Sequence, residues 1–122
     1  MSNPNIVAHF MLDPEGQPKV IKQADRKHYW IKLEIEGAPD DTYAVNYRLD
    51  DSYPDPVRES HNQSAGFAEE LTSYGDYTLQ AKIRRQSHIE TVATDLSRAL
   101  ARGHADTLSP AIQAALRDIA DH

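Results

Sequence analysis

Two stretches decide the fold: YRLDDSYPDPVR at residues 47–58 and, beyond Gly66-Phe67, SYGDYTL at residues 73–79. Each stretch places a loop with serine and tyrosine beside a strand in which apolar and polar residues alternate. Pro54 and Pro56 end the first strand, because proline has no backbone N–H to donate to a sheet. Two such loops at strand ends can build a small binding cleft on a β-sandwich, and neither contains a recognisable catalytic motif.

Alternation of the same kind predicts the remaining strands. The clearest are 29–36, 43–49 and 77–83, and shorter strands are expected at 6–11, 19–22 and 66–71. Turn signals such as Asp13-Pro14-Glu15-Gly16 separate them, which is typical of an antiparallel sandwich. The inward-facing residues of the clear strands are predicted to be Tyr29, Ile31, Leu33 and Ile35; Tyr43, Val45, Tyr47 and Leu49; and Tyr77, Leu79, Ala81 and Ile83. Thr42 is predicted to face outward.

From Ile89 the period of the apolar residues changes to that of a helix. The first predicted stripe contains Ile89, Val92, Ala93, Leu96 and Leu100, and Gly103 is its expected stop. Ser109-Pro110 has the pattern of an N-cap followed by proline at the first helical position, and the second stripe contains Ile112, Ala115, Leu116 and Ile119. We therefore expect a β-sandwich at residues 1–88 and a helical hairpin, or two appended helices, at residues 89–122.

Composition limits the function classes. The 122 residues fit one domain, and a formal charge of −6 argues against nucleic acid and anionic membranes as partners. There is no cysteine, and no apolar run approaches the roughly 20 residues that span a bilayer. The N-terminal residues lack the pattern of a signal peptide, so a cytoplasmic protein is expected.

The two stretches resemble a YEATS domain, and especially its prokaryotic branch. The family pattern Leu-His-x-Ser-Phe-x-x-Pro is matched by 49–56, its middle strand by Gly66-Phe67-Ala68-Glu69-Glu70, and its aromatic loop by 73–77. An early strand ending in glycine is matched by 28–37. The resemblance covers roughly residues 25–87, and it implies an immunoglobulin-like sandwich that acts as a non-enzymatic recognition module. In eukaryotes such domains read acylated lysine on histone tails.

The resemblance also implies which residues bind the ligand: Asp50, Ser52, Tyr53, Ser73, Tyr74, Gly75 and Asp76. Tyr53 and Tyr74 correspond to an aromatic pair that holds a flat acyl-amide, and Ser52 to the serine that bonds the amide. Three residues depart from the pattern: Asp50 replaces a histidine, Ser73 replaces a glycine and narrows the expected channel, and Asp76 adds a carboxylate. An acidic aromatic site also suits the ammonium group of unmodified or methylated lysine.

The expected partner is a protein or peptide, and the resemblance implies a sensor or adaptor in bacterial signalling or conflict systems. A competing interpretation is a scaffold in which the tyrosines cap the core and the helices mediate assembly. No cofactor is expected. The 6 histidines lack the spacing of a zinc helix, and Asp50, Asp51 and Asp55 lack the other residues of a calcium loop, so no metal site is predicted. The oligomeric state is left open by the sequence.

Overall fold

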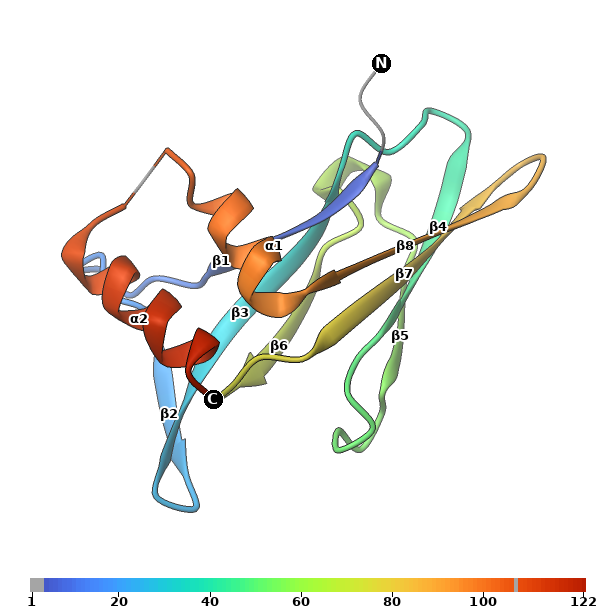
Figure 1. Ribbon diagram of the computed structural model, residues 1–122. Coiled ribbons are helices and arrows are strands. Elements are labelled where there is room, and N and C mark those ends of the chain that lie inside the picture. Colours follow the sequence, from blue (N-terminus) through green and yellow to red (C-terminus); the bar gives the residue numbers. More distant parts are fainter. Residues whose placement is uncertain (1–3, 107) are drawn as a thin grey trace.

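Alternating apolar side chains build two antiparallel sheets that face each other. Within residues 4–106 and 108–122, which the computed structural model describes, each sheet has four strands (Figure 1). The first sheet contains β1 (Asn5–Phe10), β2 (Val20–Gln23), β3 (Arg26–Glu36) and β6 (Glu69–Ser73). The second has the order β5 (Val57–Ser60), β4 (Thr42–Arg48), β7 (Thr78–Arg85), β8 (Ile89–Asp95). The predicted fold class, a mainly β immunoglobulin-like sandwich with two C-terminal helices, is confirmed.

Strand β3 is the centre of the first sheet. Its first half pairs with β2 and its second half with β1, so these two short strands follow one another along the same edge. Strand β6 pairs with the other edge of β3, from Tyr29↔Ser73 to Leu33↔Glu69. The register places Ile31, Leu33 and Ile35 in the core, as predicted.

In the second sheet a register shift between Thr42 and Ala44 changes one predicted orientation. Thr42 and Ala44 are buried, and Tyr43 is 43% exposed. The predicted inward position of Tyr43 and outward position of Thr42 are therefore wrong, because an irregularity of this kind reverses the orientation of the side chains before it relative to those after it. Val45, Tyr47 and Leu49 are buried as predicted.

The strand expected at residues 66–71 begins later, at Glu69. Gly66 instead follows a short 3-10 helix, η1 (Gln63–Ala65), and has the left-handed backbone conformation, with φ of 67°. The neighbouring Phe67 is fully buried, and its carbonyl accepts a 2.6 Å hydrogen bond from the hydroxyl of Tyr47. This contact fixes the start of β6 against the second sheet.

The helix predicted from Ile89 is wrong in its first part. Residues 89–95 form β8, which pairs with β7 along its whole length, and Ile89 is 59% exposed. Helix α1 (Leu96–Gly103) begins after Asp95, and α2 (Pro110–Ala120) begins at the predicted cap, where the Ser109 hydroxyl accepts from the Ile112 N–H. Gly103 ends α1 as predicted.

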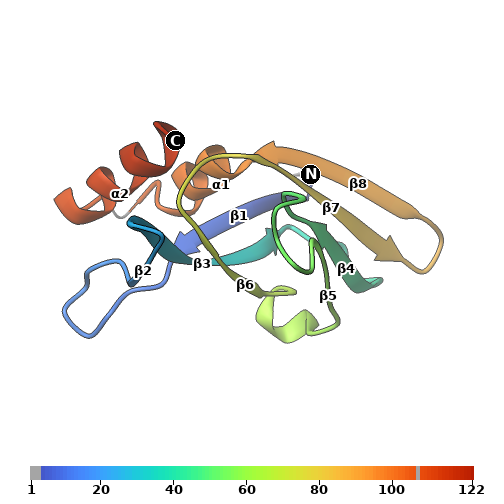
Figure 2. The ribbon, with the colours of Figure 1, turned by 90° about the horizontal axis from the view of Figure 1, so that it is seen from below.

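Helix α1 covers the outer edge of β1 (Figures 1 and 2). Arg102 donates to the Ile6 carbonyl at 2.9 Å, and the Phe10 N–H donates to His104 Nε2 at 2.9 Å. A Cβ at Gly103 would clash with the carbonyl oxygen of Ala8, so the helix approaches the strand as closely as its backbone allows. The two hydrogen bonds satisfy the Ile6 carbonyl and the Phe10 N–H on a sheet edge that would otherwise be open.

The apolar stripes of both helices face the protein interior. Those of α1 and α2 join the same core as the two sheets through Leu96, Ala99, Leu100, Ile112, Ala115 and Ile119. Leu116 is partly buried against that core. Neither helix in the described part of the chain is long and apolar enough to cross a membrane. The helices close one side of the sandwich, and the β4–β5 loop, the β6–β7 loop and His122, beyond α2, come together at one end of it.

Candidate functional site

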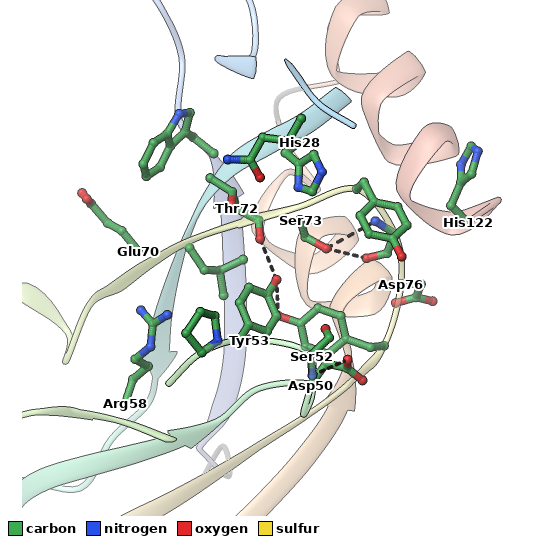
Figure 3. Close-up of a pocket in the computed structure, with 17 residues that line it drawn as sticks. His28, Asp50, Ser52, Tyr53, Arg58, Glu70, Thr72, Ser73, Asp76 and His122 are labelled. Atoms are coloured by element: carbon green, nitrogen blue, oxygen red, sulfur yellow. Dashed lines mark hydrogen bonds between the residues drawn. The ribbon is translucent and has the colours of Figure 1, made fainter. Parts of the chain in front are cut away.

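A groove of about 800 Å³ lies between the β4–β5 loop, the β6–β7 loop and strand β6. Figure 3 shows this pocket with its lining side chains. The structure brings all of the predicted ligand-binding residues to it: Asp50, Ser52, Tyr53, Ser73, Tyr74, Gly75 and Asp76. Tyr53 and Tyr74, from two loops separated by strands β5 and β6, therefore line one cavity.

Tyr53 is held rigidly at the side of the groove. Its hydroxyl donates to the Thr72 carbonyl at 2.6 Å and accepts from the Tyr77 hydroxyl at 3.1 Å (Figure 3). The two tyrosine rings are tilted against each other with centroids 5.7 Å apart. Burial raises the pKa of both hydroxyls. Because the Tyr53 hydroxyl is engaged in both directions, this residue offers a ligand mainly its ring.

Asp50 and Ser52 form a local turn at the mouth of the same loop. The Ser52 N–H donates to Asp50 Oδ2 at 3.1 Å. Hydrogen bonding from the Ser52 side chain and from its backbone lowers the pKa of the exposed Asp50 carboxyl. A serine hydroxyl that donates to a carboxylate keeps its lone pairs, so Ser52 can still accept a hydrogen bond from a ligand.

Ser73 and Gly75 are hydrogen-bonded to each other inside the second loop. The buried Ser73 hydroxyl donates to the Gly75 carbonyl at 2.7 Å and accepts from the Gly75 N–H at 3.3 Å. A Cβ at Gly75 would lie 2.8 Å from the carbonyl carbon of His122, so glycine is needed where His122, two residues beyond α2, lies against the loop. Ser73 therefore stabilises the turn through its hydroxyl.

Tyr74 is the exposed aromatic residue of the groove, with 42% of its surface accessible. The guanidinium of Arg26 lies over its ring, 4.6 Å from the centroid, and the His28 ring meets it edge-on at 5.2 Å. Both partners come from the β2–β3 hairpin, so the first sheet orients this tyrosine. The described residues show no direct ring contact between Tyr74 and Tyr53.

Asp76 does not present a free carboxylate to the groove. Its Oδ1 accepts from the Ser97 N–H at 2.9 Å, and its Oδ2 accepts from the Ser97 hydroxyl at 2.7 Å. The Leu96 N–H donates to the Tyr77 carbonyl at 2.9 Å. The aromatic loop thus satisfies the first two backbone donors of α1, and the role of Asp76 in the structure is that of a helix cap.

Several lining residues were missed by the sequence reasoning. Tyr77 was predicted only as an inward-facing strand residue, and His28, Trp30 and Arg58 were not predicted as part of a site. The outward position of Trp30 on an alternating strand was a usable signal, since a large aromatic residue there has no place in the core. Among residues 4–106 and 108–122, no cluster of three or more His, Asp or Glu side chains could hold a metal ion.

Comparisons with known proteins agree with this arrangement. A sequence model of the prokaryotic YEATS domain matches residues 29–97, which is more than half of the chain. No curated protein matches the sequence. Among solved structures, the Yaf9 YEATS domain recognizing the H3K122suc peptide is similar over 80% of this chain and 70% of that chain, with a TM-score of 0.54 and 19% identity. The yeast AF-9 homolog protein Yaf9 is similar over 76% of this chain and 65% of that chain, with a TM-score of 0.53 and 20% identity.

The structural neighbours establish the fold, and the sequence match establishes the family. The match begins at Tyr29 in β3, includes both loops of the groove and ends at Ser97, the residue that Asp76 binds. The chain therefore belongs to the prokaryotic YEATS domain family.

Proposed function

We propose that the protein is a non-enzymatic reader module whose groove binds a peptide that carries a modified lysine. The observation that carries this proposal is that both predicted loops line one groove, in which Tyr74 remains 42% exposed. If both tyrosines only capped the core, both rings would be buried with bonded hydroxyls. Tyr53 has a bonded hydroxyl and a partly buried ring, whereas the ring of Tyr74 is exposed.

The ring of Tyr53 and the hydroxyl of Ser52 suit a neutral acyl-lysine. Ser97 binds both oxygens of Asp76 and directs this carboxylate toward α1, whereas Asp50 and Glu70 are the carboxylates that remain at the groove. The lone pairs of Ser52 suit the N–H of an amide, and the ring of Tyr53 suits a flat uncharged group. The Yaf9 structure with an H3K122suc peptide supports a peptide ligand for this fold.

The competing scaffold interpretation has less support. It requires apolar helix surfaces that a partner could cover, yet Leu96 and Ile119 are fully buried and Leu116 packs against the core. The apolar stripes of the two described helices are therefore packed against the sandwich itself. A module of this kind would act in signalling by bringing a modified partner to other proteins, which is the adaptor role that we propose.

A binding screen with a matched pair of variants tests the proposal. Peptides with acylated, methylated or unmodified lysine are titrated against the protein by fluorescence anisotropy. Tyr74→Ala should weaken the binding of the preferred peptide at least about tenfold, because base-sized planar groups gain about 1–3 kcal/mol on an aromatic platform. Tyr43→Ala is the control: Tyr43 is 43% exposed and also stacks with an arginine, Arg84, but it does not line the groove.

The outcome separates the interpretations. Loss of binding in Tyr74→Ala alone, with both variants folded, supports the reader. Equal binding by both variants, or no binding of any lysine peptide by the native protein, would exclude it. Preference for the unmodified or methylated peptide would keep the groove but overturn the acyl-lysine assignment.

A further inference from the structure

The β2–β3 hairpin is a basic surface on an acidic protein. Residues 19–28 contain four of the 13 lysines and arginines and one of the 19 acidic residues. Lys19, Lys22, Arg26 and Lys27 are all exposed, and the hairpin projects away from the body of the sandwich (Figure 1). Screening limits exposed charges to a range of about 8 Å at physiological salt, so a partner that meets this hairpin responds to its local charge more than to the net charge of −6.

Within residues 4–106 and 108–122, none of these four cations forms an ion pair with a carboxylate. The ion pairs of the described residues include Lys32, Arg48, Arg58, Arg84, Arg85 and Arg98, but none of the four hairpin cations. The register places Lys22 directly opposite Lys27. Like charges in directly opposed positions destabilise a strand pair. This arrangement costs stability in the free protein and would be relieved by an anionic partner.

The basic hairpin is continuous with the groove. Gln23 and His28 line the groove, and Arg26 lies on the ring of Tyr74. Exposed Val20 and Ile21 lie between the cations and supply apolar contact area. The guanidinium of Arg26 is held in place by the ring, and a planar guanidinium presents a fork of N–H donors that fits a carboxylate.

We propose that the basic β2–β3 hairpin, residues 19–28, is a docking surface for an acidic peptide segment of the partner whose ligand group enters the groove. The link to the groove rests on the proposed function, whereas the docking surface itself does not. An acidic peptide fits better than a nucleic acid. A peptide can carry its carboxylates at the hairpin only, whereas a phosphate backbone carries a charge at every nucleotide and would also meet Asp50 and Glu70 of the groove.

The test uses a probe without any modified lysine, so its result does not depend on the ligand of the groove. A fluorescein-labelled peptide of alternating glutamate and serine is titrated by anisotropy at low salt. Lys27→Glu should weaken its binding about fivefold, as expected for the reversal of one exposed charge contact. Lys82→Glu is the control with the same charge change, at an exposed position of β7 outside the groove, and should change the affinity less than about twofold.

Misfolding cannot explain the expected loss, because Lys27→Glu replaces the Lys22–Lys27 pair by a pair of opposite charges and should raise the melting temperature. Absence of binding by the native protein, or equal losses in the two variants, would overturn the docking surface. Tighter binding of a single-stranded oligonucleotide of equal charge would also overturn it, in favour of nucleic acid. If the protein binds a lysine peptide but does not bind the acidic probe, the proposed function stands and only the docking surface is excluded.

Discussion

Replacement of Asp76 tests whether this residue caps a helix or binds a ligand. In Asp76→Ala, the N–H and the hydroxyl of Ser97 lose acceptors at 2.9 and 2.7 Å. A hydrogen bond to a charged group contributes a net of about 1.5–3 kcal/mol, and loss of an N-cap typically costs about 1 kcal/mol. The site is partly buried and its two bonds share one carboxylate, so their contributions do not add fully. We expect a loss of about 2 kcal/mol in the free energy of unfolding.

The assay is chemical unfolding together with a thermal melt. For a chain of this size, a loss of about 2 kcal/mol corresponds to a fall of roughly 8 °C in the melting temperature. Asp76→Asn keeps an acceptor for the Ser97 N–H but loses the charge, and should lose about half as much stability.

Asp95 supplies the matched control. It is the residue before α1, yet its side chain makes no capping bond to the helix. It accepts a hydrogen bond from Thr78 at 3.4 Å and forms an exposed ion pair with Arg98 at 3.7 Å. Asp95→Ala should therefore cost less than about 1 kcal/mol, mainly through the helix dipole. A larger loss in Asp95→Ala than in Asp76→Ala would refute the assignment of Asp76 as the cap. Loss of peptide binding in a fully stable Asp76→Asn would show that this carboxylate contacts the ligand.

Two further predictions concern the contact between α1 and β1. Gly103→Ala should lose about 3 kcal/mol of stability in chemical unfolding, because its Cβ would clash with the Ala8 carbonyl. Helix propensity alone predicts a gain in stability for this substitution, and such a gain would contradict the close packing. His104 accepts from the Phe10 N–H in a buried site, and burial, followed by the charge of His9, lowers its pKa. The unfolded chain therefore binds the proton first, so stability should be full above about pH 6.5 and fall with decreasing pH through the folded pKa, by at most about 1.4 kcal/mol per pH unit. His104→Gln, measured by unfolding at several pH values, should reduce this fall, and an unchanged pH profile would count against the buried neutral imidazole.

Most of the fold was predictable because its strands follow local rules. Alternation identified β3, β4 and β7, and Ser109-Pro110 identified the start of α2, since each signal depends only on neighbouring residues. Strand β8 was missed for a physical reason. Ile89, Val92, Leu96 and Leu100 happen to fit a helical stripe, but Ile89 is exposed and the strand is stabilised by its pairing with β7. Its β-branched residues Ile89, Thr91, Val92 and Thr94 were the available signal.

The candidate site was predictable in location but not in the roles of its residues. The spacing of the two loops placed seven residues near one another, and all of them line the groove. Whether a side chain is free depends on partners that are distant in the sequence. Ser97 is hydrogen-bonded to the carboxylate of Asp76, and Thr72 and Tyr77 are hydrogen-bonded to the hydroxyl of Tyr53. No local pattern contains these contacts, so the sequence alone could not show that Asp76 binds α1 and that the hydroxyl of Tyr53 is already bonded.

The same long-range contacts make the C-terminal helices part of the groove. The aromatic loop binds the first turn of α1 through Asp76, and α2 is joined to β3 by a 2.6 Å hydrogen bond from the Tyr29 hydroxyl to Asp118. His122, just beyond α2, crosses the loop at Gly75. The loop that carries Tyr74 is therefore in contact with both helical segments, whereas Tyr53 is held by Thr72 and Tyr77. For the proposed reader, a substitution in α1 or α2 outside the groove lining should therefore change the affinity for the peptide by moving the loop that carries Tyr74.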